Sequence, residues 1–304
     1  MKFPFRFINR LNRTHLYNDL IQKQVYAYST SGSGPVDLSY SSFEKDGKND
    51  NRPLVMIHGM LGSKKNFESL AKAFSMNTHR QVITVDVRNH GNSPHVAQMD
   101  YHSMAGDVEQ VLQKLGVDKA VMLGHSMGGK IAMVMALTKP HLVSKLIVED
   151  VSPTVSRLSG STSFPEYFRA MRNISFDQSA RTLADVRKET SELLKDVIPD
   201  VGVRNFVLTN IEKIDRYRWR INIDAIEANL DVLVSFPSLD TSYSGPTLFI
   251  GGSRSEHIRE ANYPEIKRLF PAVEIRHVKD AGHWVHSEKP YVFMDMVTDF
   301  MKDS

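Results

Sequence analysis

A serine flanked by glycines lies near the middle of the chain, in the five residues GHSMG at 124–128. An apolar run at 119–123 precedes this segment, and a helix-like run at 130–138 follows it. G-x-S-x-G between a strand and a helix places the serine on a tight, strained turn, where its hydroxyl is exposed for attack on a carbonyl carbon. Ser126 is therefore the candidate nucleophile. A glycine-rich turn with an incidental serine is the alternative interpretation.

A serine hydroxyl needs a base to remove its proton and a third group to orient that base. Of the twelve histidines, His283 follows the last expected strand, in DAGHW at 280–284, and is the expected base. His286 is the rival candidate. These two histidines could also form a metal pair, but no carboxylate with suitable spacing completes one, so we expect neither a metal nor a cofactor.

Three carboxylates compete for the orienting position. Asp150 ends the run LIVED at 146–150, which places it at the carboxyl end of a strand beside the serine strand. Glu256 follows a later strand, but its loop lacks an aspartate at the expected place, and Asp224 would have to reach in from outside the sheet. Because strand ends are rigid and orienting an imidazole demands rigidity, we favour Asp150 over Asp224 and Glu256. If Asp150 is not the acid, it caps the following turn through Ser152.

The oxyanion formed on attack needs two fixed N–H donors. The amide of Met127, directly after the serine, is one candidate. The loop HGMLGS at 58–63 supplies the other, because Gly59 lets the chain turn so that the amide of Met60 points into the cavity. A polar loop at 86–93 is expected to brace the rim of the site.

Short apolar runs alternate with helix-like segments along most of the chain. This alternation predicts an α/β fold with a mostly parallel sheet covered by helices on both faces, and with an early antiparallel strand at 38–43. Its core would comprise residues 35–153 and 241–304. The other expected strands lie at 54–57, 82–85, 121–123, 146–148, 246–250 and 273–278.

Residues 154–240 interrupt this alternation. They are polar and helix-like at 179–197, 203–211 and 223–234, without a buried strand. An all-helical insertion beside a candidate nucleophile predicts a cap that covers the site and contacts the substrate. A helical insertion that does not control access to the site is the alternative.

Composition narrows the function classes further. The 304 residues are 41% hydrophobic and 24% charged, as in soluble globular proteins, and no run approaches the roughly 18 apolar residues of a membrane span. The absence of cysteine excludes disulfides and a thiol nucleophile. Of the net charge of +3, the first 28 residues carry five basic groups and one acidic group, which leaves −1 for the remainder. Nucleic-acid binding therefore has no support.

The first 30 residues are arginine-rich and poor in acidic residues. Arg6, Arg10 and Arg13 recur at helical spacing with apolar residues between them, and Asp19 is the first acidic residue. This composition predicts a mitochondrial transit peptide over residues 1–30 and a location in the mitochondrial matrix. A disordered basic tail is the alternative.

Past residue 35 the chain resembles the α/β-hydrolase superfamily, and within it a group of mitochondrial serine hydrolases related to the yeast ethanol acetyltransferases. The segments that carry the resemblance are 58–64, 86–93, 124–130, 150–153, 219–224 and 282–286. It implies hydrolysis of lipid esters such as diacylglycerol and association with the 2-oxoglutarate dehydrogenase complex. By position it assigns nucleophile and base to Ser126 and His283, and leaves the acid open between Asp150 and Asp224.

These observations together predict a serine carboxylic ester hydrolase, a lipase or esterase, that forms an acyl-enzyme on a lipid or small acyl ester. Acyl transfer to an alcohol and thioester hydrolysis are alternatives of the same chemistry. A non-catalytic hydrolase scaffold is the third alternative. The presence of Ser126, His283 and both oxyanion loops argues against it, because a protein without catalytic activity does not need them together.

Overall fold

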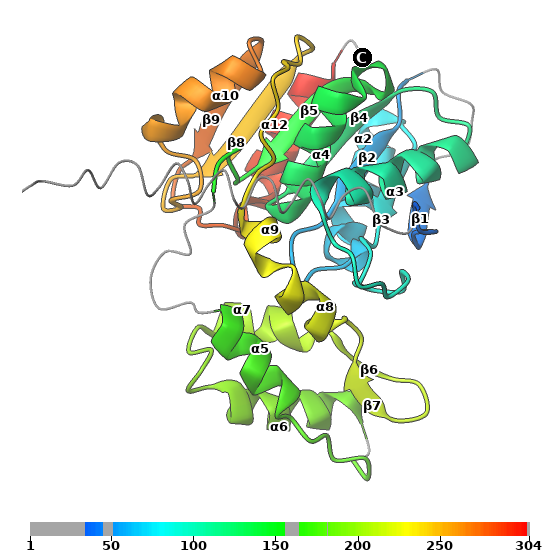
Figure 1. Ribbon diagram of the computed structural model, residues 1–304, viewed down its shortest axis with the longest axis vertical. Helices are drawn as coiled ribbons and strands as arrows, with labels where there is room; N and C mark the ends of the chain where they lie inside the picture. Colours follow the sequence, from blue (N-terminus) through cyan, green and yellow to red (C-terminus); the bar gives the residue numbers. More distant parts are fainter. Residues whose placement is uncertain (1–33, 45–50, 156–163, 181, 303–304) are drawn as a thin grey trace, which may run out of the picture. The chain divides into compact units, whose positions relative to one another are not determined.

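The computed structural model describes residues 34–44, 51–155, 164–180 and 182–302, so the expected transit peptide at 1–30 lies outside the described residues. Pro35–Ser304 form one compact unit. It contains a seven-stranded sheet in the order β1-β3-β2-β4-β5-β8-β9 (Figure 1). All neighbours pair in parallel except β1, which is antiparallel to β3. The strands are β1 (Tyr40–Phe43), β2 (Leu54–Ile57), β3 (Val82–Val85), β4 (Ala120–His125), β5 (Val143–Glu149), β8 (Thr247–Gly252) and β9 (Val273–Val278).

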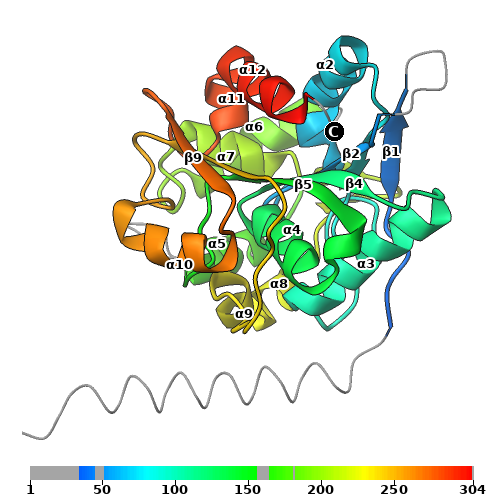
Figure 2. The ribbon, with the colours of Figure 1, turned by 90° about the horizontal axis from the view of Figure 1, so that it is seen from above.

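Helices cover both faces of this sheet (Figure 2). Successive strand residues point to opposite faces, so Val121 and Leu123 pack with the helices of one face, and Ala120 and Met122 with those of the other. The first face carries α2 (Glu68–Thr78), α11 (Val285–Glu288) and α12 (Pro290–Met301); the second carries α3 (Tyr101–Lys114), α4 (Met127–Thr138) and α10 (Tyr263–Leu269). Three 3-10 turns complete this part of the chain: η1 (Lys64–Phe67), η2 (Pro140–Leu142) and η3 (Glu260–Asn262). The predicted α/β class is confirmed.

The segment between β5 and β8, called the cap below, contains helices and one hairpin. Its described elements are α5 (Phe164–Arg172), α6 (Leu183–Leu194), α7 (Val201–Leu208), β6 (Ile211–Lys213), β7 (Tyr217–Trp219), α8 (Ile223–Ala228) and α9 (Leu230–Val234). Helix starts in this polar stretch are fixed by side chains: Thr182 caps α6, Asp200 caps α7 and Asn222 caps α8. None of the described helices is both long and apolar enough to cross a membrane.

The expectation of an all-helical cap was wrong. Ile211–Lys213 pairs antiparallel with Tyr217–Trp219, so a two-stranded hairpin separates α7 from α8. These strands are only three residues long and lie in polar sequence, so their periodicity was too short to detect. The single helix expected at 223–234 is also divided, because Asn229 leaves the helical conformation and its side chain donates to the carbonyl oxygens of Ala97 and Ala225.

Candidate active site

Ser126 lies on the turn between β4 and α4. Its backbone φ of 53° and ψ of −119° fall in a region that residues other than glycine rarely adopt, as the sequence predicted for a strained turn. The flanking glycines make the turn possible. A Cβ on Gly124 would lie 2.1 Å from the carbonyl oxygen of Gly128, and one on Gly128 would lie 2.1 Å from that of Ile57. Any other residue at either position would therefore push the turn apart.

The loop after β2 approaches this turn closely. A Cβ on Gly59 would lie 2.9 Å from His125 Nδ1 and 3.2 Å from Ser126 Cβ, so glycine is what allows the loop to pass beside the serine. Two residues after Gly59, the amide of Leu61 already has a hydrogen-bond partner, because Leu61 N donates to His90 Nε2 at 3.1 Å. The amides of Met60 and Met127 belong to the two segments that meet at Ser126, so both stay candidates for the oxyanion hole.

The structure brings His283 and Asp150 together. His283 Nδ1 lies 2.7 Å from Asp150 Oδ2, and the Asp150 side chain is fully buried. Asp150 has a positive φ of 49°, a conformation that aspartate tolerates better than most residues. Its carboxylate also accepts hydrogen bonds from Gly252 N at 3.0 Å and from the Ser255 hydroxyl. The expected alternative, a cap through Ser152, is not the contact observed.

Burial governs the ionisation of this pair. Desolvation is the largest cause that raises the pKa of Asp150 to about 6, against the opposing hydrogen bonds from Ser255 and Gly252. Desolvation also lowers the pKa of His283 to about 4, assisted by the nearby His286. A low pKa keeps the His283 ring neutral at pH 7, which is the form that can accept a proton.

The two other candidate acids lie at the surface. The Asp224 side chain is 85% exposed on α8 and pairs with Arg172. Glu256 is 61% exposed, and its carboxylate lies 3.8 Å from Arg259. Neither carboxylate has a hydrogen bond to His283 among the described residues, so the structure leaves Asp150 as the carboxylate in contact with the imidazole.

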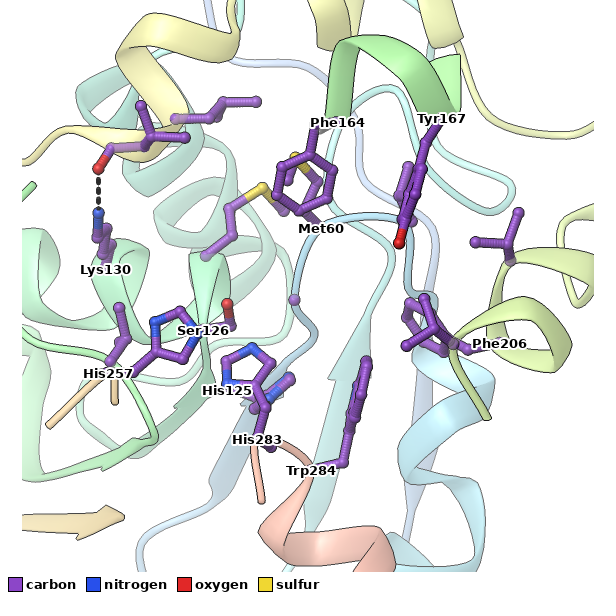
Figure 3. A pocket seen from close by; sticks show the side chains of 18 residues that line it. Met60, His125, Ser126, Lys130, Phe164, Tyr167, Phe206, His257, His283 and Trp284 are labelled. Atoms are coloured by element: carbon purple, nitrogen blue, oxygen red, sulfur yellow. Dashed lines mark hydrogen bonds between the residues drawn. The ribbon is translucent and has the colours of Figure 1, made fainter. Parts of the chain in front are cut away.

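Ser126 and His283 line a mostly apolar cavity of about 290 Å³. Figure 3 shows these two residues on the side of the sheet, while Phe164, Tyr167 and Phe206 face them from the cap. The cap thus contributes side chains from α5 and α7 to the wall, and α9 adds further apolar residues. Trp284 closes one side through a ring contact with Phe206, at 5.7 Å between centroids.

Sequence reasoning missed two polar residues that line this cavity. The ring of His257 lies 4.3 Å from that of His283, and burial lowers its pKa to about 4. Lys130 is buried on α4, and its Nζ donates to the carbonyl oxygen of Val234 at 2.9 Å (Figure 3). It also donates to the carbonyl oxygen of Ser235 at 2.8 Å. Burial lowers the pKa of Lys130 to about 7. A lone lysine at the start of an apolar helix was the available signal for Lys130; no comparable signal marked His257.

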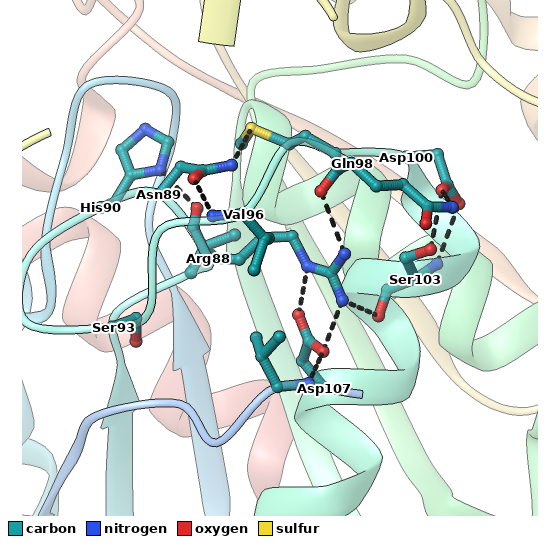
Figure 4. A network of polar contacts seen from close by, with 12 residues as sticks. Arg88, Asn89, His90, Ser93, Val96, Gln98, Asp100, Ser103 and Asp107 are labelled. Carbon is teal, nitrogen blue, oxygen red and sulfur yellow. Dashed lines mark hydrogen bonds and ion pairs between the residues drawn. The ribbon is translucent and has the colours of Figure 1, made fainter. Parts of the chain in front are cut away.

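The loop at 86–93 has the structural role expected of it. Asp86 accepts hydrogen bonds from Lys64 N and Nζ, both at 2.7 Å, which ties the loop to the segment after β2. Arg88 is fully buried and makes a two-pronged contact with Asp107, with Nε and Nη2 at 2.6 and 2.7 Å from its carboxylate oxygens (Figure 4). Paired donors and acceptors of this kind fix geometry as well as contributing energy. The loop therefore holds the rim of the site in place.

Side chains of the types that bind metal ions also gather here. Within the described residues, His125, Glu149 and His286 form one group, and Asp150, His257 and His283 form another. Neither group contains both His283 and His286, the pair considered from the sequence. Glu149 ends β5 and Asp150 follows it, so each carboxylate lies beside one of these two histidines. In both groups a carboxylate is hydrogen-bonded to an imidazole nitrogen.

Comparison with known proteins agrees with this architecture. A model of the alpha/beta hydrolase fold matches residues 52–290. The chain belongs to the α/β-hydrolase family. It is 42% identical over 271 residues to the sn-1-specific diacylglycerol lipase ABHD11 of Danio rerio, covering 89% of this chain and 84% of that protein.

Two further relatives extend the comparison. A solved structure of a marine microorganism esterase superposes with a TM-score of 0.78 at 33% identity, over 87% of this chain and 99% of that one. A probable alcohol acetyltransferase of Saccharomyces cerevisiae is 30% identical over 293 residues, covering 88% of this chain and 84% of the yeast protein. The predicted superfamily and the predicted class, a carboxylic ester hydrolase, are confirmed.

Proposed function

We propose that this ester hydrolase cleaves lipid esters, with diacylglycerol-like compounds as the substrate class, through an acyl-enzyme on Ser126. The observation that carries the proposal is the apolar cavity that Ser126 and His283 both line. An apolar wall suits an acyl chain, and the few polar groups include Ser126 and His283, which would lie at the ester bond. The relatives named diacylglycerol lipase support the same substrate class.

The proposed mechanism follows from the contacts of His283. Asp150 accepts a hydrogen bond from the Nδ1–H of the ring, which leaves Nε2 unprotonated and able to remove the proton of the Ser126 hydroxyl. The serine oxygen attacks the ester carbonyl, and the amides of Met60 and Met127 stabilise the oxyanion. The leaving alcohol takes the proton from His283. Water then repeats the sequence, and releases the acid and the free serine.

The cavity volume sets an expectation for the acyl chain. At about 30 Å³ for each methylene-sized group, close to the volume share of a water molecule, 290 Å³ holds roughly ten such groups. We expect kcat/KM for a series of p-nitrophenyl esters to rise from acetyl to about decanoyl and then to level off or fall. A steady rise through palmitoyl would contradict an acyl site limited to the volume of this cavity.

Acyl transfer to an alcohol is the second candidate function, favoured by the similarity to the yeast alcohol acetyltransferase. An acyl-enzyme can be resolved by an alcohol in place of water, so the two activities share every residue up to that step. Product analysis with an acetyl thioester or ester donor and excess ethanol separates them. Free acid as the main product supports hydrolysis, and ethyl ester as the main product supports transfer.

We propose a mitochondrial matrix location on the arginine-rich, acid-poor composition of residues 1–30. A fusion of these residues to a fluorescent protein should enter mitochondria, whereas the chain without them should not. The 2-oxoglutarate dehydrogenase complex as a partner stays a prediction of the family resemblance alone. Co-purification of that complex with the full chain from mitochondria would test it.

A further inference from the structure

A second carboxylate–imidazole pair lies directly beside Asp150 and His283. Glu149 is the last residue of β5, and His286 lies on α11, three residues after His283. Glu149 Oε1 accepts hydrogen bonds from His286 N at 2.8 Å and from His286 Nδ1 at 2.7 Å. Glu149 is fully buried and His286 is 7% exposed. The mechanism above uses neither residue.

His125 connects this second pair to the reacting residues. It directly precedes Ser126 and lies opposite Glu149 in the register of β4 and β5. Its Nε2 lies 3.0 Å from the carbonyl oxygen of His283, and its ring centroid lies 4.7 Å from that of His283 and 5.0 Å from that of His286. Burial is the main cause that holds the pKa of His125 well below its usual range. The ring is therefore neutral, and donation to the carbonyl places its proton on Nε2.

Glu149 also holds the nucleophile turn through its main chain. Its carbonyl oxygen accepts a hydrogen bond from Ser126 N at 2.9 Å. Glu149 thus contacts the backbone of Ser126 through its carbonyl oxygen. Through its carboxylate it contacts the segment that carries His283. Glu149 therefore links the segment of the nucleophile to the segment of the base.

We propose that Glu149, His286 and His125 are positioning residues, which fix the His283 segment against the nucleophile turn. This inference rests on the proposed roles of Ser126 and His283. The segment is fixed at three places. Asp150 is hydrogen-bonded to the ring of His283, and His125 to its carbonyl oxygen. Glu149 is hydrogen-bonded to the backbone N and the ring Nδ1 of His286. Misplacement of a reacting group by about 1 Å can lower a rate on the order of 100-fold.

The burial of Glu149 argues that it does more than stabilise the fold. Its second oxygen, Oε2, is buried and has no hydrogen-bond partner among the described residues. A buried carboxylate that is only half satisfied destabilises a protein relative to a well-packed neutral residue. A buried polar atom without a partner is expected mainly at functional sites, so the burial of Glu149 Oε2 is consistent with a role in the reaction.

Steady-state kinetics of Glu149→Gln, His286→Asn and His286→Leu test the proposal. Glu149→Gln keeps the shape and an acceptor at the Oε1 position for both His286 N and Nδ1, but a neutral amide accepts weaker hydrogen bonds than a carboxylate. We expect kcat to fall about 10- to 100-fold with KM changed less than two-fold, and labelling of Ser126 by a fluorophosphonate to slow by the same factor. His286→Asn places an amide N–H near the position of the Nδ1–H, so it should recover most of the activity lost in His286→Leu.

A double variant and a matched control complete the test. If Glu149 and His286 act as one unit, Glu149→Gln combined with His286→Leu should lose no more than His286→Leu alone. Glu265→Gln, which breaks an exposed ion pair with Arg268, should leave kcat unchanged. Melting curves of all variants separate loss of folded enzyme from loss of rate.

Two outcomes would overturn the inference. The first is a kcat within two-fold of the parent enzyme in both Glu149→Gln and His286→Leu. The second is a loss in all variants that follows the folded fraction alone, without rescue by His286→Asn. Activity that survives Ser126→Ala would instead refute the proposed function, whatever the Glu149 variants do, so the two failures are distinguishable.

Discussion

The replacement Asp150→Asn tests the assignment of the acid. Gly252 N donates to Asp150 Oδ1, so an asparagine would keep its amide oxygen at that position. Its amide NH₂ would then occupy the position of Oδ2, 2.7 Å from His283 Nδ1. Two donors would face each other, and the ring would be forced into the tautomer that carries its proton on Nε2. That tautomer cannot accept the proton of Ser126.

The expected loss in kcat is on the order of 10⁴, as for the equivalent change in serine proteases. At 1.36 kcal/mol for each tenfold change, this loss corresponds to about 5.4 kcal/mol of transition-state stabilisation. The fold should be retained, because the asparagine has the same shape and keeps the contact with Gly252. Hydrolysis of p-nitrophenyl octanoate, with circular dichroism as the check on folding, measures the effect.

Asp224→Asn and Glu256→Gln are the matched controls, because both carboxylates lie at the surface in ion pairs with arginine. Each should retain kcat within about two-fold, since exposed ion pairs contribute little. If Asp150→Asn kept more than a tenth of the parent activity, or if Asp224→Asn lost as much, the assignment of Asp150 would be refuted.

Three further predictions follow from the surroundings of the site. Gly59→Ala would place a methyl group 3.2 Å from Ser126 Cβ and displace the oxyanion loop, so kcat should fall about 10²- to 10³-fold in a folded enzyme; unchanged kinetics would remove the loop from the mechanism. Asp107→Ala would leave the buried Arg88 guanidinium without its partner, so unfolding free energy should fall by about 3–5 kcal/mol; a melting temperature within 2 °C of the parent would contradict this. The pKa of Asp150 is raised to about 6 and that of His283 is lowered to about 4, and protonation of either group stops the reaction, so the acid limb of kcat/KM should be centred near pH 6; a limb centred at pH 7 would contradict this.

The sequence was most informative where local chemistry decides the structure. Two glycines around Ser126 and an apolar run before them specify a strand, a turn and a helix, and the structure has all three. The parallel strands were equally visible, because buried strands are short, continuous and apolar. The loop containing Arg88 was assigned a bracing role on polarity alone, but its partner Asp107 lies on α3 and could not be identified from the sequence.

The features that the sequence did not predict depend mostly on contacts between distant parts of the chain. Asp150, Asp224 and Glu256 all suited the sequence pattern, and only the fold shows that one carboxylate touches His283 while the others pair with arginines. His257 lies against His283 because the loop after β8 folds back toward His283. No local sequence pattern predicts this contact. The hairpin in the cap was missed because three-residue strands carry almost no periodic signal.

The central claim is that the Ser126 hydroxyl is the nucleophile, and mass spectrometry of the fluorophosphonate-treated enzyme tests it most directly. One adduct per chain on the peptide that contains Ser126, lost in a folded Ser126→Ala variant together with ester hydrolysis, is the predicted result. An adduct on another residue, or hydrolysis that persists in Ser126→Ala, would contradict it.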